Sequence, residues 1–122
     1  MTLIDTSAWI HSLRRDGDPQ IRERVASLLV AGTAAWCPIV RTELWNGARG
    51  GREQRMLREM ERDLIELPLT PAVWNTADEL ARSARAQGVT VPTVDLVVQA
   101  CANHHGTVLL HADQHLRMLE EL

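Results

Sequence analysis

The chain has 122 residues, which is enough to bury one hydrophobic core. Its composition, 45% hydrophobic and 24% charged, is too apolar for a disordered chain. No apolar run approaches the roughly 18–20 residues that cross a bilayer, and the amino-terminal stretch contains Asp5 and lacks a basic start, which argues against a signal peptide. The net charge is −3 and all 13 basic residues are arginine, so mechanisms that need a lysine are excluded. We expect a cytoplasmic protein with a single domain over residues 1–122.

Hydrophobic periodicity in the first half of the chain predicts short strands alternating with helices. Proline suits the first position of a helix and glycine commonly ends one, so Pro19 and Pro38 mark helix starts and Gly32 marks a helix end. The elements expected here are a strand over residues 2–4, a helix through Leu13, a helix from Pro19 to Gly32, a strand over 33–37 and a helix from Pro38 to about Gly47.

The second half continues the alternation. Residues 51–63 predict an amphipathic helix with Met56, Leu57 and Met60 on one side. On the opposite side lies what we call the arginine face: Arg52, Arg55, Arg58 and Arg62. This face is either simply solvated or a surface that binds the phosphates of a nucleic-acid backbone. The remaining elements are a strand over 64–67, a helix from Pro71 to before Gly88, a helix from Pro92 to Gly106, a strand over 107–110 and a closing helix from Asp113.

Strands that alternate with helices imply right-handed crossovers and a parallel sheet covered on both faces. The predicted fold is therefore an α/β, three-layer α/β/α sandwich with a central parallel sheet of about four to five strands. Trp9, Trp36 and Trp74 are expected in the core. Cys37 and Cys101 lie in unrelated apolar stretches without a metal-ligand spacing, which indicates reduced core thiols.

Four acids come together when the topology is considered. Each has an ordinary structural explanation on its own, as a helix cap, a first-turn residue or a solvated side chain. In an open parallel sheet, however, the carboxyl ends of the strands and the starts of the returning helices share one edge, where ligands bind. We call the four acids expected at this edge the acid cluster: Asp5, Glu43, Asp95 and Asp113.

Clustered carboxylates repel one another unless protons or a cation neutralise them. Because the chain has no lysine, a metal ion is the expected neutraliser. Oxygen ligands favour hard cations, so we expect Mg²⁺, with Mn²⁺ as a substitute. Two such ions about 4 Å apart can activate a water and stabilise the leaving oxygen of a phosphodiester. The acid cluster thus predicts metal-dependent phosphodiester hydrolysis.

Four sequence motifs, in this order and spacing over nearly the whole chain, resemble PIN-domain endoribonucleases and specifically VapC-type toxins of toxin–antitoxin pairs. The motifs are LIDTSAW around Asp5, RTELWNG around Glu43, VDLVVQACA around Asp95 and LLHADQHL around Asp113. The resemblance implies a PIN-like fold, with the acid cluster as catalytic and metal-binding residues. It also implies a Mg²⁺-dependent endoribonuclease toxin that cuts tRNA or rRNA.

The resemblance assigns supporting roles as well. Thr6 or Ser7 would bond a metal-bound water or the backbone. The family often has a further Asp or Asn two residues after the last acid, followed by Phe, whereas this chain has His115 and Leu116 there. The fifth acid is thus absent. Its absence argues against a fully occupied second metal position but does not remove the first.

Nearby residues have alternative interpretations. His111, Asp113 and His115 alternate as zinc ligands sometimes do, but zinc favours four convergent nitrogen or sulfur ligands and neither cysteine is near in sequence. His115 alternatively contacts a phosphate or a group of the antitoxin. Trp45 alternatively stacks on a base, packs in the core or contacts a partner.

The resemblance further implies a VapB-like antitoxin as partner and a homodimer, with Leu44, Trp45 and Met56 as candidate antitoxin anchors. Phosphoryl-transfer domains such as receivers or haloacid-dehalogenase-like phosphatases also gather acids at a sheet edge. Both of these families rely on a lysine near the phosphate, and this chain has no lysine. The alternative kept open is a non-catalytic PIN-fold subunit that uses the same groove for a protein partner.

Overall fold

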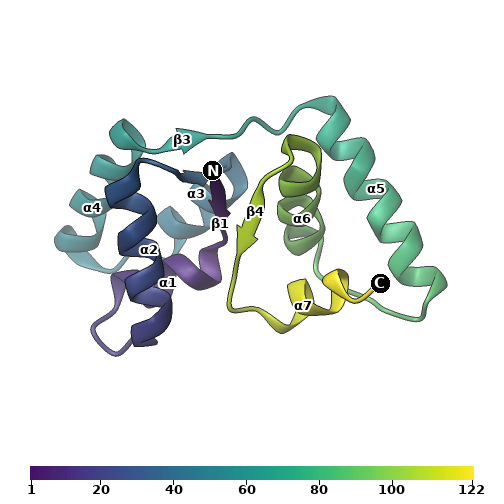
Figure 1. Cartoon of the computed structure of the whole chain (residues 1–122), viewed down its shortest axis with the longest axis horizontal. Coiled ribbons are helices and arrows are strands. Elements are labelled where there is room, and N and C mark those ends of the chain that lie inside the picture. Colours follow the sequence, from purple (N-terminus) through teal and green to yellow (C-terminus); the bar gives the residue numbers. More distant parts are fainter.

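A four-stranded, fully parallel sheet forms the centre of the computed structural model, which describes residues 1–122 (Figure 1). The strands are β1 (Thr2–Ile4), β2 (Ala34–Trp36), β3 (Ile65–Glu66) and β4 (Val108–Leu110), in the order β3-β2-β1-β4. β1 therefore lies between β2 and β4, and its Leu3 pairs in register with Ala35 and Leu109. All four strands lie within the segments expected from the sequence.

Local sequence explains where the helices begin and end. The Asp18 side chain accepts hydrogen bonds from the backbone N–H groups of Gln20 and Ile21, and Gly32 ends the same helix with a φ of 70°. The helices are α1 (Thr6–Leu13), α2 (Pro19–Ala31), α3 (Pro38–Asn46), α4 (Gly50–Asp63), α5 (Pro71–Ala86), α6 (Thr93–His105) and α7 (Gln114–Glu120).

Helices cover both faces of the sheet, which confirms the predicted three-layer sandwich. In Figure 1, α1, α2 and α4 lie on one side of β1 and β4, and α5 and α6 lie on the other. The residues of β1 and β2 are buried on both faces, as expected for strands in the middle of a parallel sheet. None of the helices combines the length and apolar character needed to span a membrane.

Two expectations about the core need correction. Trp9 and Trp36 are buried, but Trp74 is 45% exposed. It stands on the outer side of α5, whose buried positions are Val73, Ala77 and Ala84, so its hydrophobic character was a poor guide to its burial.

The two cysteines are free and buried, as expected, but their surroundings are not unrelated. The Cys101 side chain lies close enough to lower the pKa of the Cys37 thiol, which places the start of α3 against α6. Residues 64 positions apart in sequence meet here, a contact that no local pattern indicated.

Candidate metal centre

The sheet places two members of the acid cluster at adjacent strand ends. Asp5 directly follows β1 and caps α1, and Asp113 follows β4 and caps α7. Because β1 and β4 are parallel neighbours, these two turns lie at the same edge, and the backbone N–H of Asp5 donates to the Leu110 carbonyl at 2.9 Å. Asp95 lies in the first turn of α6, and Glu43 lies in α3.

Two hydroxyl groups hold the carboxylates of α1 and α3 in place. Ser7 Oγ donates to Asp5 Oδ2 at 2.6 Å and itself accepts from the backbone N–H of Ala112 at 3.0 Å, so it joins the ends of β1 and β4. Thr6 Oγ1 donates to Glu43 Oε1 at 2.6 Å. Thr6 and Ser7 therefore each donate a hydrogen bond to a carboxylate. The expected hydrogen bond between one of these hydroxyls and the backbone is made by Ser7.

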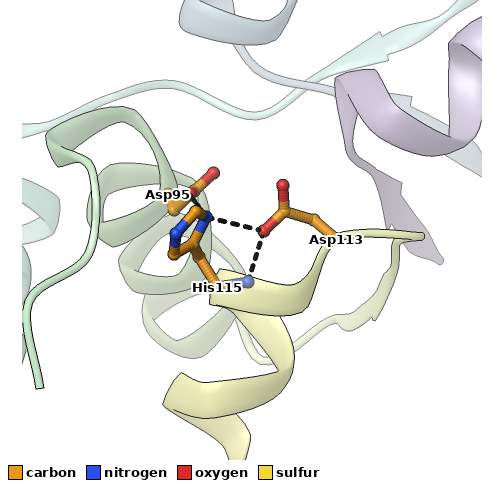
Figure 2. A group of neighbouring side chains, drawn as sticks. All are labelled: Asp95, Asp113 and His115. Atoms are coloured by element: carbon orange, nitrogen blue, oxygen red, sulfur yellow. Dashed lines mark hydrogen bonds and ion pairs between the residues drawn. The ribbon is translucent and has the colours of Figure 1, made fainter.

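Asp95, Asp113 and His115 converge on one point, as Figure 2 shows. One possible ligand atom from each lies within 4.8 Å of the others. His115 Nδ1 is 3.7 Å from both Asp95 Oδ2 and Asp113 Oδ1. Asp113 Oδ1 also accepts the backbone N–H of His115 at 2.7 Å, which orients the Asp113 carboxylate at the start of α7.

The pKa of Asp95 shows that the acid cluster shares one electrostatic environment. Burial, followed by the charges of Asp113, Asp5 and Glu43, raises this pKa from 3.8 to about 6, and His115 opposes part of that rise. No arginine forms an ion pair with a member of the acid cluster, and the only basic side chain within 4 Å of one of its carboxylates is His115. The site therefore carries more negative charge than its neighbours neutralise.

These residues fit a hard divalent cation. The donors are carboxylate oxygens with one imidazole nearby, which are ligands that Mg²⁺ and Mn²⁺ accept. A bound cation would also offset the repulsion from the neighbouring acids, which adds to burial in raising the pKa of Asp95. The structure brings Asp95 and Asp113 together with His115, and places Asp5 and Glu43 close enough to affect the Asp95 carboxyl.

A buried ion pair beside the site was not expected from the sequence. Glu53 is only 7% exposed, accepts the backbone N–H of Arg49 at 2.8 Å and pairs with Arg14 Nε at 3.0 Å. The Arg49 hydrogen bond, followed by Arg14, lowers the pKa of Glu53. Arg14 and Glu53 line a small hollow together with Thr6 and Glu43. Glu53 lies one turn before Leu57 on the buried side of α4, and this spacing was the available indication of its burial.

Asp95→Asn should raise the free energy of unfolding of the metal-free protein by on the order of 2 kcal/mol at about pH 7.5, because asparagine cannot be charged. The pKa of Asp95 is about 6 in the folded protein against 3.8 ordinarily, so this carboxyl favours folding at low pH and loses that contribution as the pH rises through about 6. The gain from the substitution should therefore be small near pH 4 and largest above pH 6. Urea unfolding in EDTA measures it, and an equal gain at both pH values would contradict the repulsion argument.

The comparison with known proteins decides the family. The PIN domain family model matches residues 2–122. Ribonuclease VapC21 of Mycobacterium tuberculosis is 34% identical over 99 residues, which cover 79% of this chain and 72% of the relative. The chain belongs to the PIN-domain family and, within it, to the VapC ribonucleases. Ribonuclease VapC11 of the same species is 32% identical over 93% of this chain and 87% of its own length.

Solved structures support the same fold. The crystal structure of VapBC2 from Rickettsia felis, bound to a DNA fragment from the promoter, superposes with a TM-score of 0.79 and 15% identity, covering 99% of this chain and 94% of that one. At this identity the similarity concerns the fold alone. The resemblance to VapC-type PIN proteins seen in the four sequence motifs is thus confirmed at the level of family and fold.

Proposed function

We propose that this protein is a divalent-metal-dependent endoribonuclease that acts as the toxin of a toxin–antitoxin pair, with the acid cluster as its catalytic metal site. The observation that carries the proposal is the meeting of Asp95 and Asp113 with His115 in a VapC-family fold, without an arginine paired to either acid and with Asp5 and Glu43 near enough to raise the pKa of Asp95. Mg²⁺ is the proposed ion, with Mn²⁺ as a substitute, and structured RNA such as tRNA or rRNA is the proposed substrate.

The residues of the site have distinct roles in this proposal. When bound, Mg²⁺ supplies an activated water and positive charge at the leaving oxygen of the phosphodiester. Asp95 and Asp113 present ligand oxygens to it from α6 and from the start of α7. Ser7 orients Asp5, and Thr6 orients Glu43 by bonding one oxygen of each carboxylate, which leaves the second oxygen available.

The arginine face supplies a surface for the RNA backbone. Its side chains are exposed on α4, and a charged hollow there is lined by Arg55, Arg58 and Arg62 together with two glutamates. The Arg58 guanidinium lies 5.6 Å from the centre of the ring of Trp45, and Trp45 follows Glu43 by two residues in α3. Because α4 also borders the hollow that contains Glu43, a strand crossing this helix would approach the acid cluster.

An apolar hollow beside the site suits a helical segment of a VapB-like antitoxin. It has a volume of about 210 Å³ and lies between α1, α2 and α4. Its lining includes Trp9, Leu13, Leu29, Met56 and Met60. Leu13 also lines the hollow that contains Glu43, so a segment seated here could extend a basic side chain toward the acids.

The proposed anchors change accordingly. Leu44 is only 4% exposed and does not line this hollow, so it offers an antitoxin seated there little surface. Met56 lines the apolar hollow, and Trp45 is half-buried beside Arg58. Met56 therefore remains the strongest of the three candidates.

The chemistry of the RNA ends tests the proposed function. Attack by water with departure of the 3′ oxygen leaves a 5′-phosphate and a 3′-hydroxyl, whereas attack by the ribose 2′-hydroxyl leaves a cyclic phosphate and needs no metal. We expect purified, antitoxin-free protein to yield 5′-phosphate and 3′-hydroxyl ends in Mg²⁺ and no cleavage in EDTA. Sequencing those ends would identify the RNA. Cyclic phosphate ends would contradict the proposal, and intact RNA under all metal conditions would favour the non-catalytic binding subunit.

A further inference from the structure

We infer that His115 is itself a metal ligand, and that its imidazole nitrogen makes this centre favour Mn²⁺ over Mg²⁺ more strongly than an all-oxygen site does. The inference rests on the proposed function, because it adds a ligand to the same centre. It assigns a role to the one position where this chain has a histidine in place of the further acid typical of the family.

The spacing of the three groups matches ligands of one ion better than partners in hydrogen bonds. His115 Nδ1 lies 3.7 Å from one oxygen of Asp95 and 3.7 Å from one oxygen of Asp113, which is too long for a hydrogen bond to either. Around an octahedral ion with ligands at about 2.1 Å, neighbouring ligand atoms are about 3 Å apart and opposite ones about 4 Å apart. The two separations from His115 Nδ1 fall between these values, and the three ligand atoms all lie within 4.8 Å of one another.

The backbone holds this arrangement without help from the imidazole. Asp113 caps α7 by accepting the backbone N–H groups of His115 at 2.7 Å and Leu116 at 3.0 Å. The His115 ring therefore leaves the first turn of α7 toward Asp95 of α6, as Figure 2 shows. Its side chain is 35% exposed, so it can adjust toward an ion without disturbing the core.

The other histidine of this segment is already occupied. His111 Nδ1 accepts the backbone N–H of Asp113 at 3.2 Å, and His111 Nε2 lies 2.6 Å from Glu120 Oε1. His104 lies in the last turn of α6, at the opposite end of that helix from Asp95. A nitrogen ligand detected at the acid cluster would therefore come from His115.

The chemical consequence concerns metal preference. Mg²⁺ is a hard ion that favours oxygen, whereas Mn²⁺ accepts imidazole nitrogen more readily, so a nitrogen ligand contributes more to Mn²⁺ binding. Loss of the imidazole should lower the affinity for Mn²⁺ by at least about tenfold and the affinity for Mg²⁺ by less. His115→Asp, which restores an oxygen ligand, should strengthen Mg²⁺ binding relative to Mn²⁺.

The test is pulsed electron paramagnetic resonance on Mn²⁺ bound to the purified protein, together with calorimetric titration of Mn²⁺ and Mg²⁺. We expect spin-echo modulation from a directly bound ¹⁴N nucleus in the wild type and in His104→Asn, and its loss in His115→Asn and His115→Gln. The ratio of Mn²⁺ to Mg²⁺ affinity should fall in the two His115 variants and remain unchanged in His104→Asn. Circular dichroism confirms that each variant is folded.

Two results would overturn the inference in different ways. If Mn²⁺ binds the wild type without ¹⁴N modulation, His115 is only a neighbouring cation, and the proposed function stands with oxygen ligands alone. If Mn²⁺ does not bind the wild type at millimolar concentration, the inference and the metal site of the proposed function both fail.

Discussion

Asp95→Asn and, separately, Asp5→Asn should lower the rate of RNA cleavage by more than about a hundredfold, because each removes a carboxylate from the acid cluster while keeping nearly the same shape. Single-turnover cleavage in saturating Mg²⁺ measures the loss. Asp95→Asn should at the same time be more stable than the wild type without metal, since it removes a carboxyl whose pKa burial and, after it, repulsion by the neighbouring acids raise to about 6. Loss of activity together with a gain in stability separates a ligand role from a structural one.

Asp78→Asn is the matched control. Asp78 is exposed on α5, and its replacement makes the same change of charge outside the acid cluster. Cleavage by this variant should equal that of the wild type. Wild-type activity in Asp95→Asn or Asp5→Asn would show that the acid cluster does not carry the reaction.

Mn²⁺ or Mg²⁺ should raise the melting temperature of the wild-type protein. An ion that binds only the folded state adds about 2.7 kcal/mol at a concentration 100 times its dissociation constant. For a chain of 122 residues this corresponds to a rise of roughly 10 °C. Thermal unfolding of EDTA-treated protein, followed with increasing Mn²⁺, measures the effect.

Asp95→Asn again provides the comparison, because it should begin with a higher melting temperature in EDTA and gain much less from Mn²⁺. Zn²⁺ should not be required for the wild type to reach its metal-bound stability. A melting temperature that Mn²⁺ leaves unchanged, or that rises equally in the variant, would place any bound ion away from the acid cluster.

The sequence predicted the parts of the site that topology alone determines. Asp5 and Asp113 follow strands, and in a parallel sheet those ends share an edge, so their position at one edge could be inferred without coordinates. Capping residues such as Asp18 and Gly32 likewise determine helix ends locally. The parallel sheet and the three layers followed from the alternation of strands and helices, whereas the strand order came only from the structure.

The features that were missed depend on contacts between distant segments. The proximity of Cys37 to Cys101, the ion pair of the buried Glu53 with Arg14, and the exposure of Trp74 arise from how helices pack against one another. Residue type gives only an average tendency toward burial. Whether an individual side chain is buried depends on how its helix is rotated about the helix axis.

The most direct test of the central claim is to measure cleavage and metal occupancy on the same samples. Metal-free protein is titrated with Mn²⁺, the bound ion is counted by electron paramagnetic resonance, and the rate of cleavage of a structured RNA is measured at each point. If the acid cluster is the catalytic metal site, the rate should rise with occupancy from near zero, and Asp95→Asn should lose both binding and cleavage. Full cleavage by metal-free protein in EDTA, or undiminished cleavage by Asp95→Asn, would contradict it.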